Sequence, residues 1–175
     1  MVDRIILVGM MGVGKTTTGR LLADRLGWPY LDSDAQVMAD TGRTVPELFA
    51  ERGEAAFRAE EERVLTEALS GEGPVVVSAA GGVVLSPANR DLLDRSGTVV
   101  WLRAEPEVLA ARVGDGTGRP LLDDDPAAAL AELYRVRRPL YEAVADAVVD
   151  VDRLPPDQVV DRVLVAAGLG SGGRA

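Results

Sequence analysis

A glycine-rich run near the N-terminus carries the most specific chemical signal in the chain. Residues 9–16 read GMMGVGKT and fit the pattern G-x-x-x-x-G-K-[ST], with an apolar run before them and a helical pattern after them. Glycines let a backbone wrap closely around phosphate oxygens, and the first turn of a helix favours anions. This position favours a phosphate-binding loop over a plain strand-to-helix turn. The amides expected to point at the phosphates are those of Gly12, Val13, Gly14, Lys15 and Thr16.

The lysine of this loop narrows the class of protein. Lys15 is the only lysine among 19 basic residues. A guanine-specific switch protein usually carries a second lysine in an N-K-x-D motif, and this chain has none left for one. The pattern therefore favours a kinase or an ATPase that uses ATP and Mg²⁺. In that role Lys15 would contact the β- and γ-phosphates, and the Thr16 hydroxyl would ligate Mg²⁺.

Two aspartates are the candidates for proton transfer. Cysteine and histidine are both absent, so a general base must be a carboxylate, a lysine or a tyrosine. Asp32 and Asp34 lie in the run LDSD, where a spacing of two places both carboxylates on the same side of an extended chain. One could support Mg²⁺ through water, and the other could orient an acceptor hydroxyl and accept its proton. The alternative is that Asp32 or Ser33 only caps the next helix.

A second apolar run ends in small residues. Residues 74–78 read PVVVS and lack the aspartate that usually follows a Walker B strand, so Asp32 is the nearest candidate on the metal side. Gly81 and Gly82 would let a substrate approach the backbone closely. The alternative for this glycine pair is an ordinary turn.

Several arginines are candidates for binding anions. Arg119 lies in a glycine-flanked loop, which suits a lid that closes over phosphates. Arg135, Arg137 and Arg138 cluster on a helical pattern, where a guanidinium fork suits a carboxylate or a phosphate; the alternative is a solvated charge cluster. Arg58 is a further candidate. Its alternative is a surface ion pair with one of three glutamates at helical spacing, Glu54, Glu61 or Glu62.

Short β-rich runs alternate with longer helical patterns along the chain, which predicts βαβ units around a parallel sheet with helices on both faces. Ligands bind beyond the carboxyl ends of the strands in such sheets, where these motifs fall. Strands are expected at residues 4–8, 30–31, 74–78, 98–102 and 147–151. Helices are expected at residues 15–26, 33–41, 45–52, 54–70, 87–95, 106–113, 126–145 and 156–167.

Length and composition limit the organisation and the partners. With 175 residues, 47% of them apolar, the chain should form one domain, over residues 1–167, with a flexible tail at 168–175 that packs against nothing. A net charge of −9 argues against a nucleic-acid binder. No apolar run approaches a membrane span, and the N-terminus lacks a signal-peptide pattern. We expect a monomer in the cytoplasm that contacts neither nucleic acid nor membrane.

Taken together, these residues resemble the shikimate kinase family. Beyond the phosphate loop, the motifs that carry the resemblance are GWPYLDSD at 27–34, GEAAFR at 53–58, RPL at 119–121 and RRPLY at 137–141. The resemblance implies ATP-dependent phosphorylation of the 3-hydroxyl of shikimate, giving shikimate 3-phosphate and ADP. It also implies a three-layer α/β/α P-loop kinase fold with a five-stranded parallel sheet ordered 2-3-1-4-5. A helical substrate-binding region would occupy about 33–62 and a mobile lid about 114–125.

The resemblance also implies roles for individual residues. Asp34 would hold the shikimate hydroxyls and act as the base, and Lys15 and Arg119 would complete the catalytic set. The substrate would be bound by Arg58, Gly81, Gly82 and Arg137 as well, against an apolar wall of Phe49 and Phe57. ATP would be bound by Gly12, Val13, Gly14, Lys15, Thr16, Thr17, Arg112, Arg119 and Arg153, and Mg²⁺ by Thr16 and Asp32.

One departure and two alternatives remain. The family usually has three glycines where this chain has Ala80, Gly81 and Gly82; a methyl group there is harmless at negative φ and costly at positive φ. Sequence logic alone does not separate a shikimate kinase from a kinase of gluconate or of a nucleoside monophosphate, because arginines bind phosphates as readily as carboxylates. A catalytically weak ATP-binding or regulatory protein is the other alternative.

Overall fold

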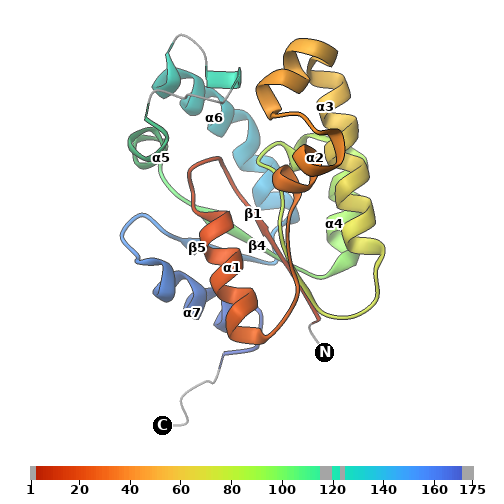
Figure 1. Cartoon of the computed structure of the whole chain (residues 1–175). Coiled ribbons are helices and arrows are strands. Elements are labelled where there is room, and N and C mark those ends of the chain that lie inside the picture. The colour runs from red at the N-terminus through yellow and green to blue at the C-terminus, as the bar shows by residue number, and fades with distance from the viewer. Residues whose placement is uncertain (1–2, 115–119, 123–124, 171–175) are drawn as a thin grey trace.

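Five parallel strands form the centre of the molecule. The computed structural model describes residues 3–114, 120–122 and 125–170. The strands are β1 (Arg4–Val8), β2 (Tyr30–Asp32), β3 (Val75–Ser78), β4 (Thr98–Arg103) and β5 (Ala147–Asp150). They pair in the order β2-β3-β1-β4-β5, and every pairing is parallel (Figure 1). The α/β fold and the strand order predicted from the sequence are confirmed.

Helices cover both faces of this sheet. They are α1 (Lys15–Leu26), α2 (Ser33–Thr41), α3 (Val45–Ser70), α4 (Pro87–Ser96), α5 (Pro106–Val113), α6 (Pro126–Val144) and α7 (Pro156–Ala166). Helices α1 and α7 pack against each other on one face, and α4 lies on the opposite face, in contact with α3 and α6 (Figure 1). Two short 3₁₀ helices, η1 (Val83–Leu85) and η2 (Pro120–Leu122), complete the described elements.

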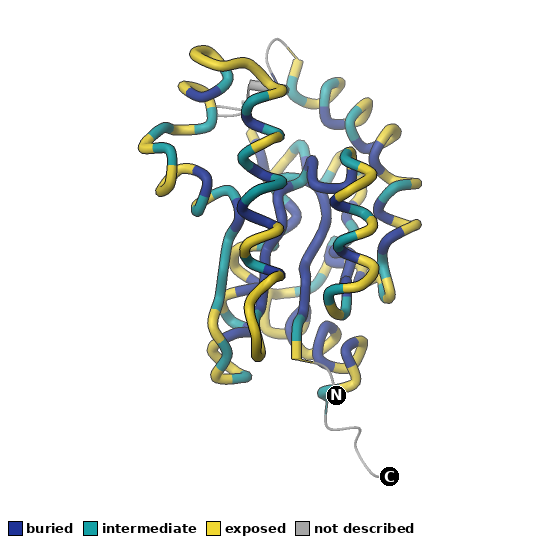
Figure 2. Tube along the Cα trace, turned by 90° about the vertical axis from the view of Figure 1, so that its right-hand side faces the viewer, coloured by how far each residue is buried: buried dark blue, intermediate teal, exposed yellow. Residues whose placement is uncertain are grey.

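The central strands are buried on both faces. Ile5, Ile6, Leu7 and Val8 of β1 are all inaccessible to solvent, which explains why the run is continuously apolar rather than alternating. Burial is deepest along the strands and decreases toward the outer faces of the helices (Figure 2). A rigid sheet therefore supports the loops that leave the carboxyl ends of its strands.

Helix α3 is divided by a glycine. The two helices expected at 45–52 and 54–70 are confirmed as two helical segments of α3, separated by a kink at Gly53, whose backbone is non-helical (φ 79°, ψ 173°). Thr44 and Glu47 form a capping box at its start, with the Thr44 amide donating to Glu47 Oε2 at 2.7 Å. A small apolar cluster lies beneath the kink, separate from the main core and made of Val37, Leu48, Phe57 and Val64.

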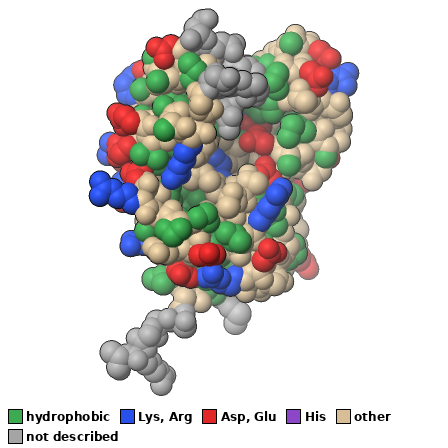
Figure 3. Space-filling view, turned by 60° about the vertical axis from the view of Figure 1, so that its left-hand side comes forward, with side chains coloured by type: hydrophobic (Ala, Val, Ile, Leu, Met, Phe, Trp, Pro, Cys, Tyr) green, Lys and Arg blue, Asp and Glu red, His purple; other side chains and the backbone are tan. Residues whose placement is uncertain are grey.

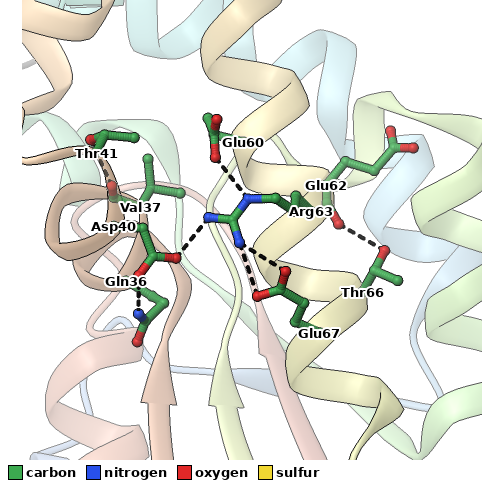
Figure 4. Close-up of polar contacts among 9 residues, drawn as sticks. All are labelled: Gln36, Val37, Asp40, Thr41, Glu60, Glu62, Arg63, Thr66 and Glu67. Carbon is green, nitrogen blue, oxygen red and sulfur yellow. Dashed lines mark hydrogen bonds and ion pairs between the residues drawn. The ribbon is translucent and has the colours of Figure 1, made fainter.

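An arginine ties α2 to the second part of α3. The Arg63 guanidinium pairs with Asp40 of α2 at 2.7 Å and, within α3, with Glu60 and Glu67, both at 2.9 Å (Figure 4). Hydrogen bonds from Arg63 and Gln36 lower the pKa of the Asp40 carboxyl, so it remains charged at neutral pH. The contact holds α2 against the part of α3 that follows Gly53.

Two segments differ from the expectations. Leu169, placed in the tail from the sequence, packs against the core, and the amides of Leu169 and Gly170 donate to the Leu164 carbonyl at 2.8 and 2.9 Å. The tail prediction is therefore wrong for these residues, because a leucine there reaches an apolar surface. In the expected lid, Leu122 is 1% exposed and belongs to the core, whereas residues 115–119 and 123–124 lie outside the described part of the chain.

No helix in the described ranges has both the length and the apolar character needed to cross a bilayer.

Candidate active site

A cavity of about 730 Å³ opens beyond the carboxyl ends of the strands. The surface is hollowed between two lobes, with basic and acidic side chains around the hollow (Figure 3). Most of the predicted site residues line this cavity: Gly12, Gly14, Lys15, Thr16, Thr17, Asp32, Asp34, Arg58, Gly81, Gly82, Arg112 and Arg137.

The phosphate loop joins β1 to α1. Gly12 (φ 80°) and Gly14 (φ 99°) adopt backbone conformations that disfavour other residues, and Gly14 is the N-cap of α1 without a side-chain capping bond. The amide donors of the first turn are thus left available for an anion. Lys15 Nζ donates to the carbonyls of Gly9 and Met10 at 2.8 and 3.0 Å, which holds its ammonium over the loop.

One member of this loop behaves differently from the expectation. The Val13 amide donates to the Met10 carbonyl at 3.3 Å, and the Val13 side chain is buried outside the cavity lining. Its N–H therefore closes the turn of the loop in this structure. The phosphate contact expected from this amide stays a prediction.

Asp32 links the loop to the next strand and also caps a helix. Its Oδ2 accepts a hydrogen bond from the Thr16 hydroxyl at 2.6 Å. Its Oδ1 accepts from the amides of Asp34 and Ala35 at 3.1 and 3.2 Å, which caps α2. The capping role posed for this residue is therefore confirmed for Oδ1, whereas Oδ2 contacts the Thr16 hydroxyl and its role beside Mg²⁺ stays a prediction.

Asp34 reaches the cavity by a different route from the one expected. The sequence argument placed Asp32 and Asp34 on one side of an extended chain. Asp32 ends β2, but Asp34 lies in the first turn of α2. Both line the same cavity because the strand-to-helix turn, not an extended backbone, brings them there.

Tyr30 and Ser78 support the loop from beneath and were not identified from the sequence. The Tyr30 hydroxyl lies 3.0 Å from Ser78 Oγ and 3.3 Å from Asp32 Oδ2, and the Ser78 hydroxyl donates to the Lys15 carbonyl at 2.9 Å. Burial is the main cause that raises the pKa of Tyr30, so its phenol stays protonated. Gly19 permits this approach, since a Cβ atom there would lie 2.5 Å from the Tyr30 ring and 2.6 Å from Ser78 Oγ.

Arg58 forms ion pairs with glutamates, as the alternative to an anion-binding role predicts, but it also lines the cavity. It contacts Glu61 at 2.6 Å and Glu54 at 3.3 Å, and its guanidinium lies 5.3 Å from the centre of the Phe57 ring. Phe57 in turn contacts Phe49 with ring centres 4.9 Å apart, and both rings line the cavity. The pair with Glu61 is therefore not a surface ion pair.

Glu61 is the charged residue most clearly missed from the sequence. Its side chain is 4% exposed and lines the cavity. Burial raises its pKa to about 7, although the Arg58 charge acts to lower it. The signal in the sequence is that Glu61 interrupts the apolar stripe that Phe57 and Val64 define on α3.

The arginine cluster on α6 divides into one buried residue and two exposed ones. Arg137 is 2% exposed and lines the cavity, and its Nε has no hydrogen-bond partner among the described residues. Arg135 and Arg138 are exposed and pair with Glu132 at 2.7 Å and with Glu142 at 3.0 Å. The solvated-cluster alternative therefore holds for two of the three.

The glycine pair lies between the two cavity arginines. A Cβ atom at Gly82 would collide with the Arg58 guanidinium, and one at Gly81 would lie 3.4 Å from Arg137 Nη1. The Ala80 amide donates to Ser33 Oγ at 2.9 Å, so the segment is also held to α2. The Val83 amide donates to the Ala80 carbonyl at 3.0 Å, so the pair does form a turn, as the alternative expected, and this turn is also part of the cavity wall.

Three predicted arginines remain, and only one of them is seen to line the cavity. Arg112 lines the cavity, and its guanidinium nitrogens lie 3.4 Å from the carbonyls of Val13 and Val151. Arg153 is exposed in the turn after β5 and is not among the lining residues. Arg119 falls outside the described residues.

The residues present fit a nucleotide with Mg²⁺. The uncapped first turn of α1, with one ammonium above it, suits the phosphates. Within the described ranges no group of three or more acidic, histidine or cysteine side chains could hold a metal by itself. The hydroxyl and carboxylate of Thr16 and Asp32 instead suit an ion that keeps several waters and is shared with phosphates, as Mg²⁺ is.

This parallel sheet, its glycine loop and the cavity beyond the strands define a P-loop α/β protein with the constellation of a kinase. The shikimate kinase family model matches residues 11–167. A shikimate kinase from Halorhodospira halophila is 48% identical over 165 residues, which cover 94% of this chain and 93% of the relative. The chain belongs to the shikimate kinase family.

Solved structures agree with this assignment. A shikimate kinase from Acinetobacter baumannii in complex with shikimate superposes with a TM-score of 0.90 at 36% identity, covering 94% of this chain and 92% of that one. A gluconokinase from Sinorhizobium meliloti has a TM-score of 0.62 at 24% identity, covering 95% and 91% of the two chains. The second likeness reflects the fold alone.

Proposed function

We propose that the chain transfers the γ-phosphoryl group of ATP to the 3-hydroxyl of shikimate, giving shikimate 3-phosphate and ADP. The observation that carries the proposal is the placement of Arg58 and Arg137 on either side of Gly81 and Gly82, in the cavity that also contains the phosphate loop. Two guanidinium groups at an apolar, largely buried wall suit one carboxylate. Shikimate carries this carboxylate on a ring that also bears hydroxyl groups.

The acceptor end of the cavity would bind the shikimate ring. Arg58 and Arg137 would bind its carboxylate, while Gly81 and Gly82 would let the ring approach the backbone. The rings of Phe49 and Phe57 would cover its apolar face. Asp34, from the first turn of α2, would hold the hydroxyl groups.

The nucleotide end would bind ATP. The amides at the start of α1 would surround the phosphates, with Gly12, Gly14 and Thr17 lining this part of the cavity. Arg112 would lie against the adenine, and the exposed Arg153 would border the same region. Mg²⁺ would be held by Thr16 and Asp32, and when bound it supplies charge neutralisation between the β- and γ-phosphates.

Phosphoryl transfer would proceed in line. The 3-hydroxyl oxygen forms a bond to the γ-phosphorus as the bond from that phosphorus to the oxygen retained by ADP breaks. Asp34 positions the hydroxyl and accepts its proton, consistent with a chain that has no histidine. Lys15 stabilises charge on the transferring group, and Arg119 of the expected lid would add a second cation.

The proposal also covers the partners, the oligomeric state and the location of the protein. A net charge of −9 is unfavourable for binding nucleic acid or an anionic membrane surface. We also propose that the chain acts as a monomer. We place this monomer in the cytoplasm.

A panel of acceptors tests the proposal. ADP release is measured with ATP, Mg²⁺ and, in turn, shikimate, gluconate, AMP and CMP. The proposal predicts release that depends on shikimate. Stimulation by gluconate or by a nucleotide, without stimulation by shikimate, would assign the chain to another kinase, and ATP binding without any acceptor-dependent release would make it a regulatory protein.

A further inference from the structure

Tyr141 lies directly behind the glycine pair at the acceptor end of the cavity. It is completely buried on α6, one helical turn after Arg137. Its ring stacks against Trp101 of β4 with centroids 5.6 Å apart and an interplanar angle of 23°. Its hydroxyl donates to the Gly81 carbonyl at 2.5 Å and lies 3.8 Å from Met10 Sδ in the phosphate loop. One side chain thus contacts the sheet, the phosphate loop and the glycine pair, and its hydroxyl also interacts with Arg137, so the Gly82 amide itself must be observed to isolate the effect on the glycine pair.

The hydrogen bond to Gly81 has a consequence for the next amide. A peptide unit is planar and trans, so the Gly81 carbonyl and the Gly82 N–H point in opposite directions. Fixing the carbonyl toward α6 therefore fixes the Gly82 N–H away from α6. This peptide is the central one of a turn, which the Val83 amide closes by donating to the Ala80 carbonyl at 3.0 Å. The central peptide of such a turn can flip between two orientations when glycine follows it, and the hydrogen bond from Tyr141 selects one of them.

The amides concerned are available to a ligand. Both glycines line the cavity, and among the hydrogen bonds between described residues neither the Gly81 nor the Gly82 amide is a donor. Burial raises the pKa of Tyr141 to about 12, so the phenol remains a donor over the pH range of any assay. The acceptor end therefore presents backbone donors whose direction depends on one buried hydroxyl.

We propose that Tyr141 is a positioning residue for the acceptor substrate, which acts by holding the Gly81–Gly82 peptide plane in the orientation that the bound acceptor requires. The identity of the acceptor as shikimate rests on the proposed function. The positioning itself rests on the contacts of Tyr141, Gly81 and Gly82.

The variant Tyr141→Phe keeps the ring and its stacking on Trp101 but removes the hydroxyl. Tyr134→Phe is the matched control, because Tyr134 is a buried tyrosine on the same helix, two turns earlier, and does not line the cavity. Steady-state kinetics are measured for both substrates. We expect KM for shikimate to rise about tenfold in Tyr141→Phe, with KM for ATP changed less than about twofold. In Tyr134→Phe all constants should stay within about twofold.

A second readout does not depend on the acceptor. In ¹⁵N relaxation measurements on the ligand-free protein, the Gly82 amide should become more mobile in Tyr141→Phe and not in Tyr134→Phe. An unchanged Gly82 amide, or equal losses for ATP and for shikimate, would overturn the positioning role. Wild-type protein that fails to phosphorylate shikimate while Gly82 responds as expected would instead overturn only the proposed function.

Discussion

The Thr16 hydroxyl donates a 2.6 Å hydrogen bond to Oδ2 of Asp32, which joins the end of the phosphate loop to the end of β2. The other oxygen of Asp32 caps α2, the helix whose first turn carries Asp34. A single carboxylate therefore fixes the position of the proposed Mg²⁺ ligand relative to the proposed base. Tyr30 and Ser78 keep that carboxylate in place from beneath.

Asp32→Asn separates the charge of this residue from its capping role. Asparagine caps helices about as well as aspartate, so α2 should remain intact and the melting temperature should change little. Loss of the charge should lower either the apparent affinity for Mg²⁺ or the activity at saturating Mg²⁺, by about 10- to 100-fold. Titration of activity against Mg²⁺ measures the effect, and an unchanged titration would show that Asp32 is only a cap.

Asp34→Asn should lower kcat by at least about a hundredfold, because the acceptor hydroxyl loses the group that accepts its proton. ATP affinity, measured by calorimetry, should stay within about twofold. Asp40→Asn is the control, because Asp40 lies on the same helix but pairs with Arg63 rather than lining the cavity. Full activity in Asp34→Asn would refute the assignment of the base.

Arg137→Lys should raise KM for shikimate about 10- to 100-fold, since an ammonium cannot replace a guanidinium fork at a buried carboxylate site. Arg138→Lys is the control. Arg138 is the next residue, on the exposed side of α6, where it pairs with Glu142, so its substitution should leave KM for shikimate unchanged. Equal effects of the two substitutions in steady-state kinetics would argue against a carboxylate at Arg137.

Glu61→Gln should alter how stability depends on pH. Burial raises the pKa of Glu61 from 4.5 to about 7, so the folded protein keeps a proton that the unfolded chain releases in this window. The stabilisation linked to that proton is complete below the unfolded pKa and is lost as the pH rises through about 7. The variant, which cannot ionise, should therefore gain stability relative to wild type as the pH rises.

Urea unfolding at several pH values between about 5 and about 8 measures this difference. Glu67→Gln is the control, because Glu67 lies on the exposed side of the same helix. A constant difference between Glu61→Gln and wild type across this range would contradict the buried, proton-binding state of Glu61.

The fold and the phosphate loop were predictable because their signals are local. Apolar runs marked the strands, and the glycines, Lys15 and Thr16 lie within eight residues of one another. Gly53 also marked the kink in α3 correctly. The geometry of Asp34 was not predictable from spacing, since it depends on where β2 ends and α2 begins.

The supporting residues depend on contacts distant in the sequence. Tyr30 and Ser78 are 48 positions apart, and Tyr141 and Gly81 are 60 apart, so no local pattern joins them. Two residues did carry a usable signal. Glu61 interrupts an apolar stripe on α3, and Arg137 lies on the face of α6 that Tyr134 and Tyr141 define, which separates it from its two neighbours.

The identity of the phosphorylated product tests the central claim most directly. Shikimate is incubated with ATP, Mg²⁺ and the protein, and the product is analysed by mass spectrometry and by ³¹P and ¹H NMR. The account predicts one phosphate on the 3-hydroxyl and one ADP formed for each product molecule. A phosphate on another hydroxyl, or ATP consumed without any phosphorylated shikimate, would contradict it.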